Sequence, residues 1–443
     1  MKVPPGPKNI IPGTNLRGLQ HDSLRFLECA AKRYGDSVHF RIGPRRIYFF
    51  NHPELVRDVL VTRNASFAKG MVLQRTKVVL GEGLLTSEPP LHRRQRRLAQ
   101  PAFHRERIAR YAEVMIERAA RARERWRDGE TLDIAHEMMR LTLSVVAKTL
   151  FDADVDDNAD EIGGALTELV EMFPLLVHPF SDIIRKLPLP RVRRFERALA
   201  QLDRVIYKII EERRRSSEDR GDLLSMLLLA QDDEEGSGGM SDRQVRDEAM
   251  TLFLAGHETT ANALSWTWWQ LAANPEAEAA LHRELDSILG DRLPTPADYP
   301  RLPVTEMILA ESMRLYPPAW GIGRLAIEDV EIGGWTVPKN ALVIVAQWVS
   351  HRDERFWPDA ERFDYTRFTP EAKASRPRFA YYPFGAGPRI CIGEGFAWME
   401  GVIMLATLAQ KWRFARTDDV VKPQAYITLR PKGGMRMRAN ARR

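Results

Sequence analysis

The stretch Phe384-Gly-Ala-Gly-Pro-Arg-Ile-Cys-Ile-Gly393 decides how the rest of the chain is interpreted. It places Cys391 in a glycine-rich turn directly before a helical pattern that begins near Gly393 and includes Phe396 and Ile403. The dipole and the free backbone N–H groups at a helix start favour the thiolate, which is a good metal ligand. The glycines of the turn allow another group to approach the backbone closely.

The kind of metal that this turn would bind is limited by the ligands near Cys391 in the sequence. No second cysteine or histidine stands near it at the spacing of a zinc site. A thiolate bound to haem iron fits better, because one protein ligand is enough there. The alternative is a buried, inert cysteine, which is the usual state of a lone cysteine. The flanking phenylalanine, glycines and arginine favour the metal ligand.

A long helical pattern occupies the middle of the chain. It begins at Ser241 and Gln244, which fit a capping box, and continues without a break to Asn274-Pro275. At ~1.5 Å per residue, these roughly 32 residues form a rod about 48 Å long. The acidic, glycine-rich stretch 232–239 before it predicts a loop. Apolar residues on most faces predict a buried central helix.

Polar residues interrupt this helix in the stretch Ala255-Gly-His-Glu-Thr-Thr260. Gly256 costs the helix about 1 kcal/mol, a cost that is explained if the missing side chain leaves room for a small ligand. The Thr259 hydroxyl can bond back to a carbonyl, and Glu258 can relay protons. The alternative is a polar patch on an amphipathic helix. His257 has no partner at i+4 and is not predicted to bind a metal.

A charge pair follows in the next helical pattern. Glu311 and Arg314 lie three residues apart on one face, where a bidentate ion pair can form. Downstream, the stretch Phe356-Trp-Pro-Asp-Ala-Glu-Arg-Phe363 supplies Arg362, a third charge that would join the pair in a buried network. The expected role is structural, and the alternative is an ordinary surface ion pair.

In their order, these four elements resemble those of the cytochrome P450 haem-thiolate monooxygenases, and the resemblance spans nearly the whole chain. It implies a mainly α fold with small β sheets and a long central helix across the haem. It also implies that Cys391 is the iron ligand of haem b. Glu258 and Thr259 match the family's acid–alcohol pair, which handles dioxygen and its protons, and Gly256 matches the glycine beside the oxygen pocket.

The resemblance assigns further residues around the cofactor. Glu311, Arg314 and Arg362 match the family's structural triad. Basic side chains hold the haem propionates in this family, and solvated surface is the alternative for each arginine. The residues expected to contact the haem, apart from Cys391, are His92, Arg96, Arg324, Phe384, Arg389 and Gly393.

The implied reaction is hydroxylation, in which one oxygen atom from O2 enters a C–H bond of an apolar substrate. A fatty acid, a terpenoid or a carotenoid fits the apolar residues that the family's topology places around the substrate pocket. These residues are Phe67, Met71, Val72, Leu73, Ala255, Ala319, Trp320, Ile322 and Ile427.

The sequence contains no flavin or dinucleotide domain, so electrons are expected from a separate ferredoxin or flavodoxin-type donor with its NAD(P)H reductase. The arginines between Arg93 and Arg110 are basic enough to dock an acidic donor. A solvated helix face and a nucleic-acid patch are the alternatives. Nucleic acid is not expected as a partner, because no binding motif or aromatic platform accompanies the basic run.

Composition limits the remaining choices. The 443 residues are 44% hydrophobic and 28% charged with a net charge of +6, which excludes a disordered chain. Two cysteines indicate a reducing, cytoplasmic location. No apolar run is long enough to span a membrane, which leaves only peripheral contact with lipid open. We expect an extended proline-rich segment at 1–20, one haem-binding domain at 21–443, and two short strands within 37–50.

Two other functions fit parts of the sequence. A peroxide-driven haem-thiolate peroxygenase would share Cys391, but such enzymes resemble an arrangement without the acid–alcohol pair found at Glu258 and Thr259. A non-catalytic haem protein that binds a ligand or senses gas would leave that pair unexplained. The sequence therefore favours the monooxygenase.

Overall fold

The computed structural model describes residues 2–8, 13–154, 159–176, 181–216, 220–229 and 240–442, so the predicted loop at 232–239 lies outside the described residues. The chain divides into two compact units. The first consists of Met1–Arg75, Ala310–Cys391 and Ile427–Arg430, and the second of Thr76–Leu309, Ile392–Tyr426 and Pro431–Arg443. No helix among the described residues is both long enough and apolar enough to cross a membrane.

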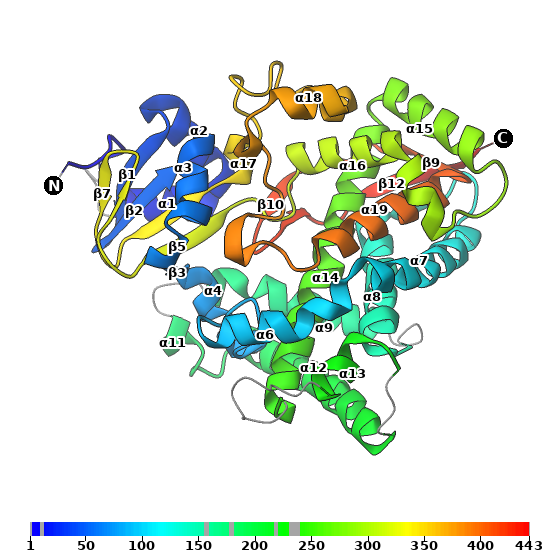
Figure 1. The fold of residues 1–443 in the computed structure, drawn as a ribbon, viewed down its shortest axis with the longest axis horizontal. Helices are drawn as coiled ribbons and strands as arrows, with labels where there is room; N and C mark the ends of the chain where they lie inside the picture. The colour runs from blue at the N-terminus through cyan, green and yellow to red at the C-terminus, as the bar shows by residue number, and fades with distance from the viewer. Residues whose placement is uncertain are drawn as a thin grey trace. The chain divides into compact units, whose positions relative to one another are not determined.

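A five-stranded sheet of order β1-β2-β8-β5-β3 organises the first unit, drawn in blue and yellow in Figure 1. Its strands are β1 (Ser37–Ile42), β2 (Arg45–Phe50), β8 (Leu342–Val345), β5 (Ile322–Ala326) and β3 (Phe67–Lys69). The expected strand pair within 37–50 is confirmed, with Ile42 opposite Arg45 and Gly43 at φ 57° in the turn. The β2–β8 pair is parallel and the other pairs are antiparallel.

Helices and a hairpin surround this sheet. A hydrophobic core forms where residues of the sheet such as Tyr48 and Val343 pack with Val56 and Leu60. The hairpin consists of β6 (Val330–Ile332) and β7 (Trp335–Val337). The helices are α1 (Thr14–His21), α2 (Ser23–Tyr34), α3 (Pro53–Arg57), η1 (Asp58–Thr62), η2 (Asn64–Ser66), α4 (Met71–Arg75), α17 (Gln347–Ser350), η6 (Tyr365–Phe368), α18 (Pro370–Ser375), η7 (Arg378–Ala380) and η8 (Gly387–Arg389).

The N-terminal segment differs in part from the expected extended conformation of residues 1–20. Residues 2–8 have no helix or strand, and the Pro5 carbonyl accepts a hydrogen bond from the His39 N–H at 3.0 Å. Helix α1, however, begins at Thr14, because the prolines end before this point. It is held by Asn15, which is buried and donates to the Arg41 carbonyl at 3.1 Å.

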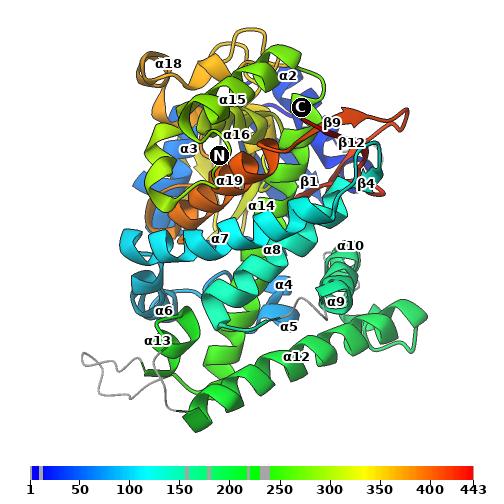
Figure 2. The same ribbon diagram turned by 90° about the vertical axis from the view of Figure 1, so that its right-hand side faces the viewer.

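The second unit is mainly helical, as the pattern between 92 and 230 predicts. Helix α14 packs along α8, and α7 packs along α19 (Figure 2). A three-stranded sheet has the order β4-β12-β9. The elements are α5 (Lys77–Leu80), α6 (Leu91–Ala99), η3 (Gln100–Phe103), α7 (Arg105–Arg125), β4 (Thr131–Asp133), α8 (Ile134–Phe151), α9 (Ala159–Glu171), α10 (Phe173–Leu176), α11 (Ser181–Ile184), α12 (Pro190–Ser216), α13 (Leu223–Leu229), α14 (Asp242–Leu271), α15 (Pro275–Ile288), η5 (Pro296–Arg301), α19 (Glu394–Ala409), β9 (Trp412–Arg416), β10 (Pro423–Ala425) and β12 (Arg436–Ala441), while α16 (Pro303–Leu315) and β11 (Leu429–Pro431) have residues in both units.

The long helix predicted in the middle of the chain is α14, which has 30 residues. The capping box is present: the Ser241 hydroxyl accepts from the Gln244 N–H at 3.3 Å, and the Gln244 side chain accepts from the Ser241 N–H at 2.9 Å. Most of its residues are buried, including Trp266 and Trp268. The prediction of a buried helix is therefore confirmed.

Candidate functional site

The loop that carries Cys391 is closed by its own backbone. The Cys391 N–H donates to the Phe384 carbonyl at 3.0 Å, and the Ile390 N–H donates to the Gly387 carbonyl at 3.0 Å. Because these bonds turn the chain back on itself, Cys391 is held at a fixed place while it stays exposed. Two residues later, Gly393 is the N-cap of α19.

Glycine is required in this loop at one position above all. Gly387 has φ +71°, and a Cβ there would lie 2.2 Å from the Leu60 carbonyl oxygen. The loop backbone therefore lies directly against η1, at a distance that no other residue type permits. Gly385 has φ +73°, and a Cβ there would contact Ile322 at 3.4 Å.

The donor set at Cys391 fits a haem. Among the residues that the structure describes, no group of three or more His, Cys, Asp or Glu side chains could hold a metal ion. A metal bound to the exposed Cys391 thiolate would therefore have to bring most of its own ligands, as the iron of a porphyrin does. A cysteine held by backbone hydrogen bonds and left accessible suits that arrangement.

The polar stretch predicted in the central helix lies near the middle of α14. The Thr259 hydroxyl donates to the Ala255 carbonyl at 2.8 Å, as expected from the sequence. Glu258 is buried, with 3% of its surface exposed. The ring of the buried His257 contacts the Phe253 carbonyl through Nδ1 at 2.8 Å.

Gly256 lies against a second helix. A Cβ at this position would lie 3.1 Å from Val146 on α8, and Gly256 itself is partly exposed. It allows α8 and α14 to approach closely. The Thr142 hydroxyl of α8 accordingly reaches the His257 carbonyl at 2.9 Å.

A buried carboxyl that the sequence analysis missed lies in the same unit. Glu400 on α19 is fully buried, and burial raises the pKa of its carboxyl to about 8, which the hydroxyl of Thr260 on α14 opposes only in part. Glu400 is therefore mostly protonated at neutral pH. The signal was present, because Glu400 is the one charged residue between Gly395 and Ala409.

The cations predicted to hold propionates lie in both units. On α6 of the second unit, His92 is buried and Arg96 is partly buried. In the first unit, Arg324 is a buried residue of β5 that pairs in register with Lys69 of β3, and Arg389 is a partly buried residue of η8.

The predicted substrate residues divide into three groups. Phe67 does not line a pocket as expected, because alternation along β3 turns its side chain into the hydrophobic core. Val72 on α4 is exposed. Ala319 and Ile427 lie in neighbouring segments, which are joined by a hydrogen bond from the Leu429 N–H to the Pro318 carbonyl at 2.9 Å. The partly buried residues of the set are Met71, Leu73, Ala255, Ala319, Trp320, Ile322 and Ile427.

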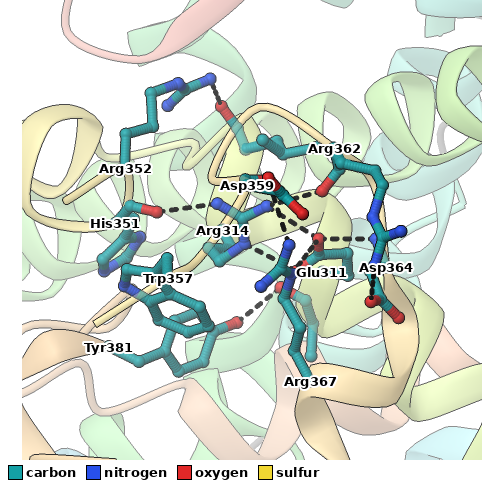
Figure 3. A network of polar contacts seen from close by, with 12 residues as sticks. Glu311, Arg314, His351, Arg352, Trp357, Asp359, Arg362, Asp364, Arg367 and Tyr381 are labelled. Atoms are coloured by element: carbon teal, nitrogen blue, oxygen red, sulfur yellow. Dashed lines mark hydrogen bonds and ion pairs between the residues drawn. The ribbon is translucent and has the colours of Figure 1, made fainter. Parts of the chain in front are cut away.

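The predicted charge network is present around Arg314, whose side chain is 0% exposed (Figure 3). Its guanidinium donates twice to Glu311, at 2.7 and 2.8 Å, and once to the His351 carbonyl at 2.8 Å. Arg362 contributes its carbonyl, 3.2 Å from Arg314, rather than its side chain. The Arg362 guanidinium is 65% exposed and binds Asp364.

A different arginine therefore takes the place expected for the Arg362 side chain. Arg367 lies 3.6 Å from the Glu311 carboxylate and is 11% exposed. The Asp364 N–H donates to the same carboxylate at 2.8 Å. Sequence spacing could not separate the two arginines, because they lie only five residues apart. Arg362 precedes the short helix η6, and Arg367 lies within it.

Comparison with known families identifies the chain. The family model described as Cytochrome P450 matches residues 4–436. The chain belongs to the cytochrome P450 family. The enzyme is accordingly a haem-thiolate monooxygenase that binds a haem, receives electrons from redox partners and hydroxylates an apolar substrate.

Several bacterial P450s are similar over most of their length. Cyclooctatin synthase of Streptomyces melanosporofaciens is 43% identical, with 92% of this chain and 90% of the relative covered. Cyclooctat-9-en-7-ol 5-monooxygenase of the same organism is 39% identical, with 88% and 84% covered. Pentalenene oxygenase of Streptomyces avermitilis is 36% identical, with 92% and 91% covered.

The fold is also that of a P450. The crystal structure of the cytochrome P450DA heme domain is similar with a TM-score of 0.88 and 26% identity, and the match covers 100% of this chain and 98% of that chain. The predicted mainly α fold with small sheets is thus confirmed.

The network around Arg314 generates a stability prediction. Arg314→Met leaves the Glu311 carboxylate buried without its main partner, and we expect a loss of about 3–5 kcal/mol in the free energy of unfolding. Arg362→Ala keeps the carbonyl that Arg314 uses and removes only an exposed ion pair, so we expect a loss below about 1 kcal/mol. Urea denaturation followed by circular dichroism measures both. Equal losses in the two variants would place the Arg362 side chain in the network after all.

Glu400 generates a pH prediction. Between the ordinary pKa of 4.5 and about 8, the unfolded carboxyl releases a proton that the folded one keeps, so wild-type stability falls as pH rises through this range. Glu400→Gln has the same shape and does not titrate. We expect equal stabilities near pH 4.5 and a variant more stable than wild type by roughly 2–5 kcal/mol above pH 8. Urea denaturation at each pH measures the difference, and parallel curves for the two proteins would contradict the prediction.

Proposed function

We propose that this P450 hydroxylates a cyclic terpenoid at a haem b whose iron is bound by the Cys391 thiolate. The observation that carries the proposal is the backbone-closed loop, which holds Cys391 in place and leaves its thiol exposed.

The substrate class is inferred from the names of the relatives. These names favour a terpenoid over a fatty acid or a carotenoid. Three P450s that are 36–43% identical over nearly the full chain have names that specify cyclooctatin, cyclooctat-9-en-7-ol and pentalenene. The partly buried apolar side chains among the predicted pocket residues, such as Leu73 and Ile322, suit a compact hydrocarbon.

When bound, the haem supplies the redox chemistry that activates O2 and places one oxygen atom in a C–H bond. Cys391 would hold the haem as the thiolate, and His92, Arg96, Arg324 and Arg389 would neutralise its carboxylates.

The acid–alcohol pair has a defined starting state. The Thr259 hydroxyl proton is committed to the Ala255 carbonyl, so the hydroxyl oxygen accepts a hydrogen bond first and donates one only after it rotates. Glu258 precedes Thr259 in the chain and is buried. We assign to Glu258 the supply of protons to the site. Its burial limits exchange with solvent, which meters that supply.

Electrons would come from a ferredoxin or flavodoxin-type protein with its NAD(P)H reductase, in the cytoplasm where such reductases work. Arg93 and Arg97 on α6 and Arg105 and Arg110 on α7 are exposed and form a basic surface for an acidic donor. Arg107 is excluded from this set, because its guanidinium donates to the Gly221 carbonyl.

The assignment of Cys391 is tested by the absorption spectrum of the purified protein, reduced with dithionite and treated with carbon monoxide. We expect the strongly red-shifted Soret band of a thiolate-bound haem in the wild type and its loss in Cys391→Ser, because a serine oxygen is a poor replacement for the thiolate. Cys29→Ser is the matched control, since Cys29 is the other exposed free cysteine. An unchanged band in Cys391→Ser, or its loss in Cys29→Ser, would refute the assignment.

The substrate class is tested by titrating the oxidised protein with a cyclic terpene hydrocarbon. We expect a Soret shift as the apolar ligand displaces water at the iron, with a dissociation constant on the order of micromolar. A linear fatty acid with the same number of carbon atoms is the control and should bind at least about tenfold more weakly. Tighter binding of the linear acid would contradict the proposed terpenoid substrate and indicate a fatty acid instead.

A further inference from the structure

A short segment of the second unit is held against the start of α14 by three consecutive helix residues. This segment, here called the 76–87 segment, consists of α5 and the chain that follows it to Ser87. Arg246, Asp247 and Glu248 of α14 all contact it, and all three are buried. Burying three adjacent charges is costly unless each one has a partner. The partners of these three residues therefore show which parts of the chain they hold.

The two carboxylates hold the backbone of the 76–87 segment. Asp247 accepts the Glu82 N–H at 2.9 Å, and Glu248 accepts the Leu84 N–H at 3.0 Å. The chain also lies close to α14 just before Glu82. A Cβ at Gly81 would lie 2.1 Å from the Asp247 carboxylate.

A Cβ at Gly83 would likewise lie 2.1 Å from the hydroxyl oxygen of Thr251, another residue of α14. The segment is also bound to α6. Gln95 of α6 donates to the Glu82 carbonyl at 2.5 Å and accepts from the Ser87 hydroxyl at 2.6 Å. The segment is therefore a rigid strap between α14 and α6.

Arg246 adds a connection to a different helix. Its guanidinium donates to the Val79 carbonyl at 2.9 Å, to Asp247 at 2.9 Å, and to Asp203 of α12 at 2.7 and 2.5 Å. Its side chain is 10% exposed, and that of Asp203 is 31% exposed. A single side chain thus joins α12, α14 and the 76–87 segment.

We propose that Arg246 is a positioning residue that locks α12 to the 76–87 segment and so holds the segment in place when a large apolar substrate enters. This inference rests on the proposed function, because the segment follows directly on Met71 and Leu73, which are predicted to line the substrate pocket. A loosened segment would admit bulky ligands faster and hold them less firmly.

The chain offers a matched control for the Arg246 contact. Arg214 of α12 donates to Asp242 of α14 at 2.6 Å, so it joins the same two helices. Its side chain is 44% exposed and that of Asp242 is 55% exposed. Arg214 also donates to the Met240 carbonyl at 3.5 Å. Arg214→Met therefore tests the loss of an exposed α12–α14 ion pair.

The first test is hydrogen–deuterium exchange of the full-length protein, read in peptides that cover residues 76–87. We expect Arg246→Met to raise their exchange by at least about tenfold, because the Val79 carbonyl loses its partner and Asp247 loses its cation. Arg214→Met should leave it within about twofold of wild type. Equal exchange in the wild type and Arg246→Met would overturn the proposal.

The second test measures ligand access in the haem-loaded protein by stopped-flow absorbance. We expect Arg246→Met to bind and release clotrimazole, a bulky apolar imidazole, at least about fivefold faster than wild type, while the rate for carbon monoxide stays within about twofold. Carbon monoxide is small enough to enter without moving the segment. A purely structural defect would change both rates or neither, and would contradict the positioning role.

A milder variant keeps the proposal testable if Arg246→Met does not fold. Asp203→Asn removes the negative charge that Arg246 binds on α12. It leaves the contacts of Arg246 with the Val79 carbonyl and with Asp247 in place. We expect faster clotrimazole binding with unchanged exchange at residues 76–87, since only the coupling is broken. Unchanged clotrimazole rates would refute the coupling. If the wild type lacked a thiolate-haem spectrum, the proposed function would fail, and the exchange experiment would still decide whether Arg246 holds the segment.

Discussion

The hydrogen bond from the Cys391 N–H to the Phe384 carbonyl is the interaction on which the first unit depends, because it presents the thiol through backbone geometry alone. The loop that it closes lies against the Leu60 carbonyl, where only Gly387 fits. The residues before the loop are tied down in turn. Tyr381 donates to the Ala310 carbonyl at 2.9 Å, which joins the start of the loop to α16. The thiol is thus exposed on a backbone that has little freedom.

His351 connects this loop to the buried charge network. Its carbonyl accepts from Arg314 at 2.8 Å, and its ring nitrogen Nε2 accepts from the Tyr382 N–H at 3.0 Å. The second bond requires a neutral ring, because a protonated imidazole has no acceptor. Burial, followed by the charges of Arg314, Arg352 and Arg376, lowers the pKa of His351 well below its ordinary value, so the ring stays neutral. The arginine that binds Glu311 therefore also preserves the histidine that holds the chain before Cys391.

The sequence predicts those parts of the site that depend on local pattern. The turn before Cys391, the capping box of α14, the bond from Thr259 to Ala255 and the pair Glu311–Arg314 all involve residues close together in the chain, and all are present. It fails where tertiary packing decides. Phe67 turns into the core, and the exposed Arg362 leaves its expected place to Arg367. Each of these outcomes depends on a neighbour that is distant in sequence.

Buried carboxyls in the second unit reach neutrality in two different ways. Asp247 has the guanidinium of Arg246 and the Glu82 N–H, so its charge is matched by donors that the fold brings to it. Glu400 has the Thr260 hydroxyl near it, and burial raises its pKa to about 8, so it keeps its proton at neutral pH. A matched charge requires its partners to stay in place, which makes it suitable for fixing the 76–87 segment. A protonated acid adds no charge to the interior beside Thr260, the residue that follows Thr259 in the chain. The start of α14 therefore carries a charge matched by fixed donors, while its middle contacts an acid that carries none.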